Sequence, residues 1–386
     1  MAAKDRMLST LLVGKGREHA IAWKLTRSQL VKHVWIAPGN AGTEVLPKKL
    51  CINLVVIGPV HHVVGGLDGT PCFAPRKRAA IVEGSKDWAK DFMCRWKIST
   101  AAYETFAKMD YGKAKAFLRT SDRRVVIKAD GLAAGKNVVV PDTPEEAEKA
   151  LEEVMLGSKF DKAGERVIVE EYLEGYEISV LTFADGSSIL ALHPGQDHEP
   201  AHNGDEGLNT GGKGVCIRFQ TIIRPTLRGL ELDDKLVRLV LLLSIPLALV
   251  LEYNARFGDP ETQSMILLLS DEALPELILA CMEKRLADVK PSVPSEFACN
   301  MTVAAGVYPE SYRKGDIVRM DTPLQGVHIF HTGTERVGSE SKTAGGRVFS
   351  VAATGKTLKE AISAAYAGVE GIHFEGMSHR RDIAAR

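Results

Sequence analysis

The sequence has no excess of charge of either sign. Its 386 residues include 49 Lys and Arg and 49 Asp and Glu, so the formal net charge is zero. Proteins that attract nucleic acid or anionic membranes through a long-range field usually carry a basic excess or a basic run. Basic runs longer than a few residues are also absent. We therefore expect neither nucleic acid nor membrane as a partner.

Long hydrophobic segments are missing as well. The apolar run at residues 239–251 contains Ser244 and Pro246 and is shorter than the roughly 20 residues of a membrane-spanning helix. At the N-terminus, Lys4, Asp5 and Arg6 precede a short apolar run that lacks the pattern of a secretory signal. These features predict a cytoplasmic protein.

Cysteines are few and have no C-x-x-C spacing. Because zinc sites and redox pairs usually show such short spacings, we expect reduced, mostly buried thiols. Four histidines near the C-terminus lack a carboxylate cluster of metal spacing, and we expect them to be core or surface residues. The cysteines are Cys51, Cys72, Cys94, Cys216, Cys281 and Cys299, and the histidines are His328, His331, His373 and His379.

The length and the order of predicted elements indicate a mixed α/β protein of two or three domains. Residues 1–85 are typical of a shortened Rossmann-like βα unit, residues 86–272 hold the motifs described next, and residues 290–386 alternate strands with one helix. A helix is predicted from Thr143 to Leu156, with Thr143 as N-cap and Pro144 at the first position. Strands are expected at 327–331 and 347–352, and a helix at 358–369.

A predicted strand and turn at residues 125–136 (VVIKADGLAAGK) form the most informative motif. Small residues allow a turn to approach a polyphosphate with free backbone N–H groups, and Lys128 and Lys136 supply positive charge. The motif differs from the common G-x-x-x-x-G-K loop because it is one residue short and Asn137 replaces the metal-binding Ser or Thr. Taken alone, it is as consistent with an ordinary hairpin turn.

A second motif lies at residues 250–261 (VLEYNARFGDPE). If residues 247–255 form a strand, side chains alternate, so Glu252, Asn254 and Arg256 share one face. Carboxylate and carboxamide oxygens suit Mg²⁺, which shares its other positions with water and phosphates. The arginine is suited to stabilise a transferring phosphoryl group. A solvated strand face is the alternative.

Between these motifs, residues 167–179 (VIVEEYLEGYEIS) predict a strand, an acidic hinge and a second strand. Backbone groups of such a hinge can bind the edge of adenine, and a carboxylate such as Glu177 can bind ribose hydroxyls. The hinge is weak evidence when taken by itself.

In this order the three motifs resemble the ATP-grasp superfamily, and the flanking residues are similar to the glycinamide ribonucleotide synthetases, also called phosphoribosylamine–glycine ligases. The resemblance runs nearly end to end. Its further motifs are residues 12–24, 37–43, 55–59, 83–86, 196–198, 209–212 and 256–261.

The resemblance implies an ATP-grasp fold with an N-terminal Rossmann-like domain and a small C-terminal β-rich domain. It also implies a purine-biosynthesis ligase that joins glycine to 5-phosphoribosylamine through a glycyl phosphate, with ATP and Mg²⁺ or Mn²⁺ as cofactors. The family's fused eukaryotic forms suggest a longer multifunctional polypeptide, with a further synthetase domain after Arg386, as its setting.

The resemblance also implies roles for individual residues. Catalysis is assigned to Arg256 and Lys128, and the metal to Glu252 and Asn254. The ATP-binding residues are Lys86, Lys128, Gly131, Gly135, Lys136, Glu170, Glu171, Tyr172, Leu173 and Glu177. Glycine and phosphoribosylamine are assigned to Asp197, His198, Asn209, Thr210, Gly211 and Gly212.

The chain departs from the family pattern in the substrate loops and before the metal strand. Glu199 and Pro200 replace a basic pair, and Lys213 replaces a methionine. Residues 236–251 are expected to join a helix end directly to the metal strand, so that the sheet lacks a member. We therefore expect ATP binding to be better preserved than ligation.

Three interpretations follow. The first is the ligase, favoured by Lys128, Lys136, Glu252, Asn254 and Arg256. The second is a catalytically impaired or non-catalytic relative that retains nucleotide binding, favoured by Glu199 and Pro200. The third is an ATP-grasp ligase for another carboxylate, which the retained residues 196–198 and 209–212 oppose.

Overall fold

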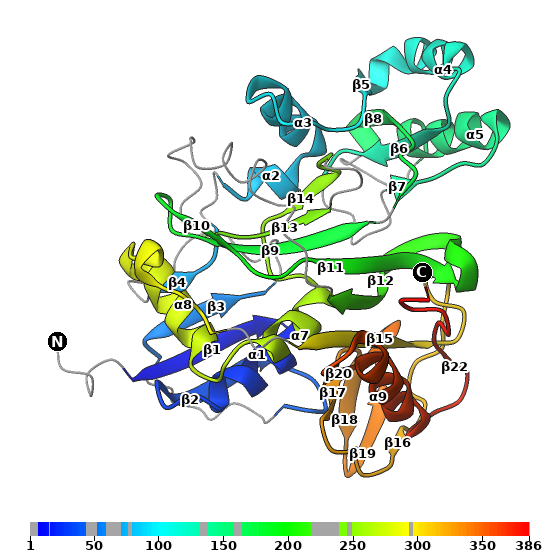
Figure 1. The fold of residues 1–386 in the computed structure, drawn as a ribbon. Helices are drawn as coiled ribbons and strands as arrows, with labels where there is room; N and C mark the ends of the chain where they lie inside the picture. Colours follow the sequence, from blue (N-terminus) through cyan, green and yellow to red (C-terminus); the bar gives the residue numbers. More distant parts are fainter. Residues whose placement is uncertain are drawn as a thin grey trace.

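We describe the fold from a computed structural model of the chain. It describes residues 7–14, 16–43, 52–58, 71–75, 79–131, 138–157, 164–175, 177–217, 239–244, 249–292 and 296–385. Figure 1 shows an upper lobe, a long sheet across the middle, and two lower units on either side of α7 (Glu261–Met265). In the described part of the chain, no helix is long and apolar enough to cross a membrane.

The N-terminal unit is a parallel sheet in the order β2-β1-β3-β4. Its elements are β1 (Leu8–Gly14), α1 (Arg17–Thr26), β2 (Val31–Pro38), β3 (Leu54–Ile57) and β4 (Cys72–Phe73). Parallel neighbours need a crossover, which α1 supplies between β1 and β2. Leu12, Ile21 and Leu25 are fully buried where this helix covers the sheet. The predicted Rossmann-like start is confirmed.

The upper lobe is an antiparallel sheet in the order β5-β8-β6-β7. Leu151 and Val154 of α5 pack on Ile127 and Val167 of this sheet in one hydrophobic cluster. Thr143 caps α5, because its hydroxyl accepts a hydrogen bond from the Glu146 N–H at 3.2 Å, as predicted. The lobe contains β5 (Tyr103–Ala107), η3 (Lys108–Asp110), α4 (Tyr111–Thr120), β6 (Val125–Ala129), β7 (Val138–Val139), α5 (Pro144–Met155) and β8 (Arg166–Glu171), and α2 (Ile81–Gly84) and α3 (Lys86–Arg95) precede it.

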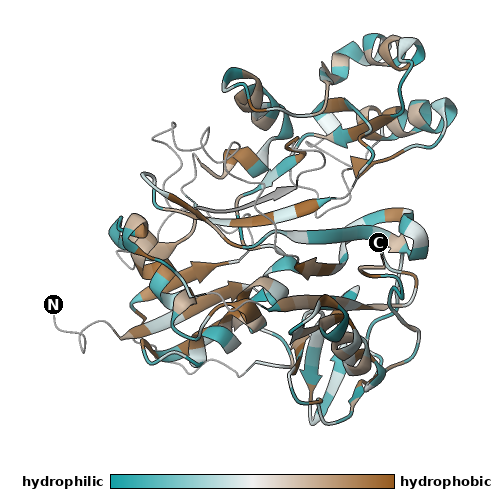
Figure 2. Ribbon diagram, viewed as in Figure 1, coloured by the Kyte–Doolittle hydropathy of each residue, from teal (hydrophilic) through white to brown (hydrophobic). Residues whose placement is uncertain are grey.

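The long sheet has the order β14-β13-β9-β11-β12-β15-β20-β17. Figure 2 shows that β11 is mostly hydrophilic whereas β9 is largely hydrophobic. The polar strand inside the sheet therefore points to a site rather than to core packing. The strands are β9 (Ile178–Ala184), β11 (Gly195–His202), β12 (Glu206–Ile217), β13 (Leu239–Ser244), β14 (Glu252–Asn254), β15 (Phe297–Ala305), β17 (Val327–His331) and β20 (Arg347–Gly355), with β10 (Ile189–Ala191) and β22 (Met377–Ser378) at its sides.

The C-terminal unit shares this sheet, since β15 pairs with β12 along Gly214–Ile217. Helix α9 (Leu358–Glu370) packs on β15 and β20, and its capping box joins Thr357 and Glu360. The predictions of a strand at 327–331, a strand at 347–352 and a helix at 358–369 are confirmed. The remaining elements are η5 (Asn203–Asp205), η6 (Ile266–Leu268), α8 (Ala273–Glu283), η7 (Leu286–Asp288), β16 (Arg319–Met320), β18 (Thr334–Val337), β19 (Glu340–Thr343) and β21 (Ile372–His373).

The predicted helix end at residues 236–251 is wrong for Leu239–Ser244. These residues form β13, which lies between β9 and β14 and pairs with both. The expected gap in the sheet before the metal strand is therefore filled. A short apolar run is consistent with a buried helix or a buried strand, and periodicity alone does not separate them. Of the described residues 249–255 in the predicted metal strand, Glu252–Asn254 form β14.

The expectation of reduced thiols is wrong for one pair of cysteines. Cys216 and Cys299 form a disulfide between β12 and β15, where the two residues lie directly opposite each other in register. Cys94 is an exposed free thiol. Two cysteines 83 residues apart in sequence give no spacing signal, because the register of two strands brings them together.

Two histidines join the N-terminal and C-terminal units. The backbone N–H of His331 donates to Nδ1 of His19 at 3.0 Å, and Nδ1 of His331 lies 2.9 Å from Oγ1 of Thr334. Burial lowers the pKa of each histidine to about 4. The folded state therefore rejects a proton that the unfolded chain accepts below about pH 6.5.

We predict that folding stability is full above about pH 6.5 and is lost progressively as the pH falls towards 4. The loss is on the order of 2 kcal/mol for each histidine. Urea unfolding between pH 7.5 and 4.5 measures it, and His331→Asn should reduce the dependence on pH. His33→Asn, at an exposed position, is the control. Equal slopes for His331→Asn and the unmodified chain would contradict the prediction.

Candidate nucleotide and substrate site

A buried carboxylate holds two ammonium groups where the upper lobe meets α3. Oε2 of Glu170 lies 3.0 Å from Nζ of Lys128 and 3.1 Å from Nζ of Lys90. The side chain of Glu170 is 2% exposed. Lys90 also donates to Oγ1 of Thr100 at 2.7 Å, and Thr100 donates to the Val250 carbonyl at 2.6 Å. The cluster therefore links the upper lobe to the segment that leads into β14.

The predicted metal strand presents its side chains as the alternation requires. Nδ2 of Asn254 donates to Oε1 of Glu252 at 3.1 Å, and Nη2 of Arg256 donates to Oδ1 of Asn254 at 2.9 Å. Glu83 holds the following turn, since its carboxylate accepts from Nε of Arg256 at 2.9 Å and from the Ala255 N–H at 2.7 Å. The three predicted residues therefore form one hydrogen-bonded row.

The base of the phosphate loop is fixed to α3. Oδ1 of Asp130 accepts from the Asp87 N–H at 3.2 Å, and Oδ2 accepts from Oγ of Ser85 at 3.2 Å. Lys86 is the first residue of this helix. Gly131 has a φ of +101°, which favours glycine. Gly135 and Lys136, which the sequence assigned to ATP, lie outside the described residues.

Electrostatic interactions connect the lysines with the metal strand. Burial alone would raise the pKa of Glu252, but Lys86 and Lys128 outweigh it and lower that pKa. Burial alone would lower the pKa of Lys128, whereas Glu170 and Glu252 raise it. Both groups are therefore held in their charged forms, and the predicted phosphate and metal groups lie close enough to interact.

The donor set at β14 fits a hard cation. Glu252 is held ionised, and its Oε2 has no protein partner among the described residues. Ionised carboxylate oxygens are what Mg²⁺ prefers. No group of three or more His, Cys, Asp or Glu side chains is arranged for a metal in the described ranges. The assignment of the metal to Glu252 and Asn254 therefore stays a prediction.

The hinge after β8 has backbone N–H groups with and without partners. The N–H groups of Glu171 and Tyr172 already donate to the carbonyls of Ala102 and Arg124, at 2.9 and 2.8 Å. The Leu173 N–H has no partner in the described part of the chain. An adenine edge needs such a donor. The carboxylate of Glu170 binds lysines instead, so any adenine contact of this residue has to use its backbone.

The predicted substrate residues lie on β11 and β12. Oδ1 of Asp197 accepts from the His198 N–H at 2.7 Å, and Oγ1 of Thr210 donates to the Glu199 carbonyl at 2.6 Å. Nδ2 of Asn209 donates to the Glu199 carboxylate. Burial, Glu177 and Asp197 raise the pKa of Glu199 well above its usual range. The substituted Glu199 thus lies among carboxylates in this region.

Strand alternation separates two neighbouring predicted residues. Asp197 lies near Glu177 and Glu261, whose charges, after burial, raise its pKa. The ring of His198 instead accepts at Nε2 from the Ala384 N–H at 3.2 Å, beside the C-terminal segment. Burial and Arg380 lower the pKa of His198 to about 4. The two side chains therefore have different surroundings, and their shared pocket stays a prediction.

Glycine and arginine residues form the junction with the C-terminal unit. Gly212 has a φ of +103°, and a Cβ there would lie 2.5 Å from Cδ of Pro260. Nη1 of Arg347 donates to the carbonyls of Gly211 and Asp259. The Asp259 carboxylate also lies 3.7 Å from Nη2 of Arg17. Gly211 and Gly212 of β12, which are predicted to line the substrate pocket, are thus held between the start of α7 and the arginine of β20.

Several residues of this site are assigned no role from the sequence: Lys90, Thr100, Asp130, Lys213, Asp259 and Arg347. Lys90 follows Lys86 by one helical turn, the spacing that places two side chains on one face of a helix. The sequence therefore contains a pattern that could have identified Lys90. Arg347 and Asp259 are 88 residues apart, and no local pattern connects them.

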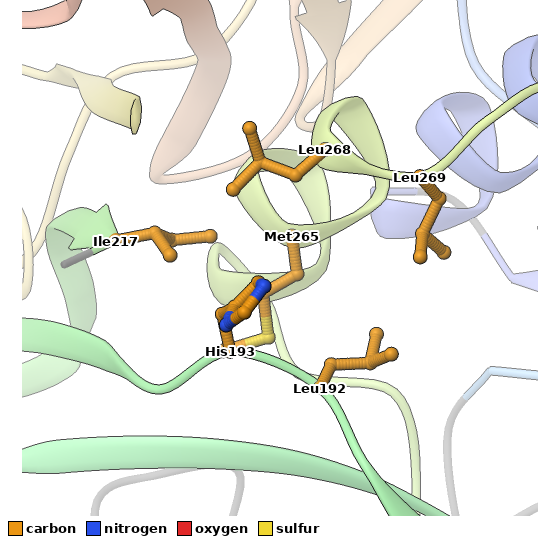
Figure 3. A pocket seen from close by; sticks show the side chains of 6 residues that line it. All are labelled: Leu192, His193, Ile217, Met265, Leu268 and Leu269. Atoms are coloured by element: carbon orange, nitrogen blue, oxygen red, sulfur yellow. The ribbon is translucent and has the colours of Figure 1, made fainter. Parts of the chain in front are cut away.

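A small pocket lies apart from these charged groups (Figure 3). Five of its six lining side chains are apolar, so it does not suit a polyphosphate. They belong to the loop before β11, to the end of β12 and to the α7–η6 turn: Leu192, His193, Ile217, Met265, Leu268 and Leu269.

Models of one known protein family match the chain in three consecutive segments. The chain matches the N domain of phosphoribosylglycinamide synthetase at residues 8–83, its ATP-grasp (A) domain at 84–262 and its C domain at 298–386. The predicted boundaries at residues 85, 272 and 290 stay predictions.

Named relatives cover the chain almost completely. The phosphoribosylamine–glycine ligase of Synechocystis is 40% identical over 95% of this chain and 97% of its own length, and that of Vibrio vulnificus is 37% identical over 98% of both. The bifunctional purine biosynthetic protein ADE1 of Schizosaccharomyces pombe is 42% identical over 97% of this chain. The chain spans about half the length of such bifunctional relatives (53% for ADE1).

Solved structures of other proteins are similar to this chain over nearly its whole length. Phosphoribosylamine–glycine ligase from Thermotoga maritima superimposes with a TM-score of 0.82 at 30% identity, covering 97% of this chain and 100% of that protein. Biotin carboxylase from Campylobacter jejuni, at 10% identity and a TM-score of 0.68, shares the fold alone. The ATP-grasp fold class is confirmed, and the chain belongs to the phosphoribosylglycinamide synthetase family, the phosphoribosylamine–glycine ligases.

Proposed function

We propose that this chain joins glycine to 5-phosphoribosylamine at the expense of ATP. The glycine carboxylate attacks the γ-phosphorus of ATP and releases ADP. The amine of phosphoribosylamine then attacks the carbonyl of glycyl phosphate, and loss of phosphate and a proton leaves glycinamide ribonucleotide. No covalent enzyme intermediate is required, so catalysis depends on positioning and charge stabilisation.

One structural observation supports this proposal independently of family membership. Lys86 and Lys128 act electrostatically on Glu252, and Asn254 connects that carboxylate to Arg256 through two hydrogen bonds. These groups come from three separate segments of the chain, and the fold gathers them into a single charge network. A polyphosphate and its cation are the ligands that need such alternating charges.

Individual residues take the following roles in the proposal. Lys86 and Lys128 bind ATP phosphates, Leu173 donates its N–H to adenine, and Glu177 binds the ribose. Glu252 and Asn254 would hold Mg²⁺, which supplies charge neutralisation between the phosphates when it is bound. Arg256, oriented by Glu83, stabilises negative charge on the transferring phosphoryl group.

The acceptor side is assigned to β11 and β12. Asp197 and the loop Asn209–Gly212 would line the pocket for glycine and phosphoribosylamine. The full-length ligase relatives do not favour a non-catalytic relative or another carboxylate substrate. The bifunctional relatives support the proposal that the chain belongs to a longer polypeptide with a second activity, and a cytoplasmic location stays a prediction.

Product formation tests the proposal. The chain is incubated with ATP, glycine, phosphoribosylamine and Mg²⁺, and glycinamide ribonucleotide and ADP are measured. We expect the two products in equal amounts, and none after the metal is chelated with EDTA. ADP release that does not depend on glycine, or the absence of glycinamide ribonucleotide, would reject the ligase function.

Lys128→Met is expected to weaken ATP binding about tenfold or more, because a charge-assisted contact to phosphate is lost. Glu170 keeps Lys90 as its partner in this variant, so the carboxylate is not left unpaired. Calorimetry measures ATP affinity, with Lys149→Met on the exposed surface of α5 as the matched control. Unchanged affinity in Lys128→Met would remove this lysine from the nucleotide site.

Glu199→Gln is expected to lower the KM for phosphoribosylamine, because an ionised Glu199 repels the substrate phosphate. The raised pKa of Glu199 means that the carboxyl is neutral at low pH and ionised at high pH. The variant should therefore match the unmodified chain at low pH and exceed it as the pH rises. Replacing Glu199 and Pro200 together by basic residues should increase the effect. A KM ratio that does not vary with pH would contradict this explanation.

A further inference from the structure

Lys213 is a buried lysine that has no acidic partner among the residues that the structure describes. It follows the substrate loop Asn209–Gly212 on β12, and it is 2% exposed. Within the described residues, no hydrogen bond or ion pair joins its ammonium to another side chain or to the backbone. Other buried lysines have carboxylates: Lys90 and Lys128 share Glu170, and Lys24 binds Asp271.

The charges around Lys213 are positive. Burial first, then Arg380 and Arg347, lower its pKa to about 8. Both arginines are already neutralised: Arg380 pairs with Asp205 and Asp382, and Arg347 lies 3.4 Å from Asp259. An unpaired ammonium in such a place is costly. The fold therefore leaves one positive charge uncompensated next to the substrate loop.

The other groups that face Lys213 suit an anion. The ring of Tyr308, after β15, lies 5.8 Å from its ammonium, and the Tyr308 hydroxyl is 3.5 Å from the Gly211 N–H. His379, on the C-terminal segment, is neutral in its surroundings because burial, Arg381 and Lys213 lower its pKa. His379 thus adds no negative charge beside Lys213, and Asp382 of the same segment is already paired with Arg380.

We propose that the Lys213 ammonium binds a phosphate group at the junction of β12 with the C-terminal unit. This proposal rests on the proposed function and deepens it: the phosphate is the 5-phosphate of phosphoribosylamine. Lys213 stands where the family pattern has methionine, and the family's basic pair is replaced here by Glu199 and Pro200.

Direct binding tests the site without turnover. Ribose 5-phosphate, inorganic phosphate and ribose are titrated into the unmodified chain, Lys213→Met, Lys213→Arg and the control Lys359→Met on the exposed surface of α9. At pH 7 we expect Lys213→Met to weaken ribose 5-phosphate binding about tenfold or more. Lys213→Arg and Lys359→Met should retain it. Binding to the unmodified chain should weaken between pH 7.5 and 9, as Lys213 loses its proton, and binding to Lys213→Arg should not.

A folding defect is not expected to cause the loss of ribose 5-phosphate binding in Lys213→Met. Lys213→Met removes an unpaired buried charge, so its thermal midpoint should equal or exceed that of the unmodified chain. Equal ribose 5-phosphate affinity in Lys213→Met and the unmodified chain overturns the proposal. Lys213-dependent binding of inorganic phosphate without binding of ribose 5-phosphate overturns the assignment to the substrate phosphate.

Kinetics separate this proposal from the proposed function. Lys213→Met should raise the KM for phosphoribosylamine and leave the KM for ATP unchanged. If Lys213→Met forms glycinamide ribonucleotide with an unchanged KM for phosphoribosylamine, the site fails and the function stands. If the unmodified chain forms no product but binds ribose 5-phosphate through Lys213, the site stands and the function fails.

Discussion

The Glu170 carboxylate is the interaction on which the nucleotide site depends. A single oxygen accepts two ammonium groups, from Lys90 and Lys128, in a place that excludes nearly all solvent. Without that carboxylate, two like charges would be buried together, which is far more costly than leaving one group unpaired. Lys90 then reaches the Val250 carbonyl through Thr100. The same carboxylate thus fixes Lys128, which is predicted to bind phosphate, and links the upper lobe to the segment that leads into β14.

A second carboxylate, Asp259, has a similar role at the other end of the site. Burial alone would raise the pKa of Asp259, but Arg347 and Arg17 lower it. These two arginines belong to the C-terminal and N-terminal units, and Asp259 directly follows the metal segment along the chain. A single ionised side chain therefore orients three parts of the structure around the part of β12 that carries Gly211.

Local patterns in the sequence were sufficient for elements whose signals are local. The cap of α5 at Thr143, the helix from residue 358 and the shared face of Glu252 and Asn254 follow from spacing and alternation alone. The run that forms β13 was misread because a short apolar segment carries no helix or strand period of its own. The pairs Cys216–Cys299 and Lys90–Glu170 depend on register and packing between distant segments, so no window of sequence contains them.

The carboxylates of the site show why burial alone does not set their charge. Glu252 is half-buried and Asp197 is buried, and loss of solvent by itself raises the pKa of each. Glu252 lies beside Lys86 and Lys128, and its pKa is lowered. Asp197 lies beside Glu261 and Glu177, and its pKa is raised well above the usual range. The neighbouring lysines therefore keep the metal strand anionic, whereas crowding among carboxylates favours protonation on β11. Neighbouring charge, and not burial, therefore decides which carboxylates of the site are ionised and which favour protonation.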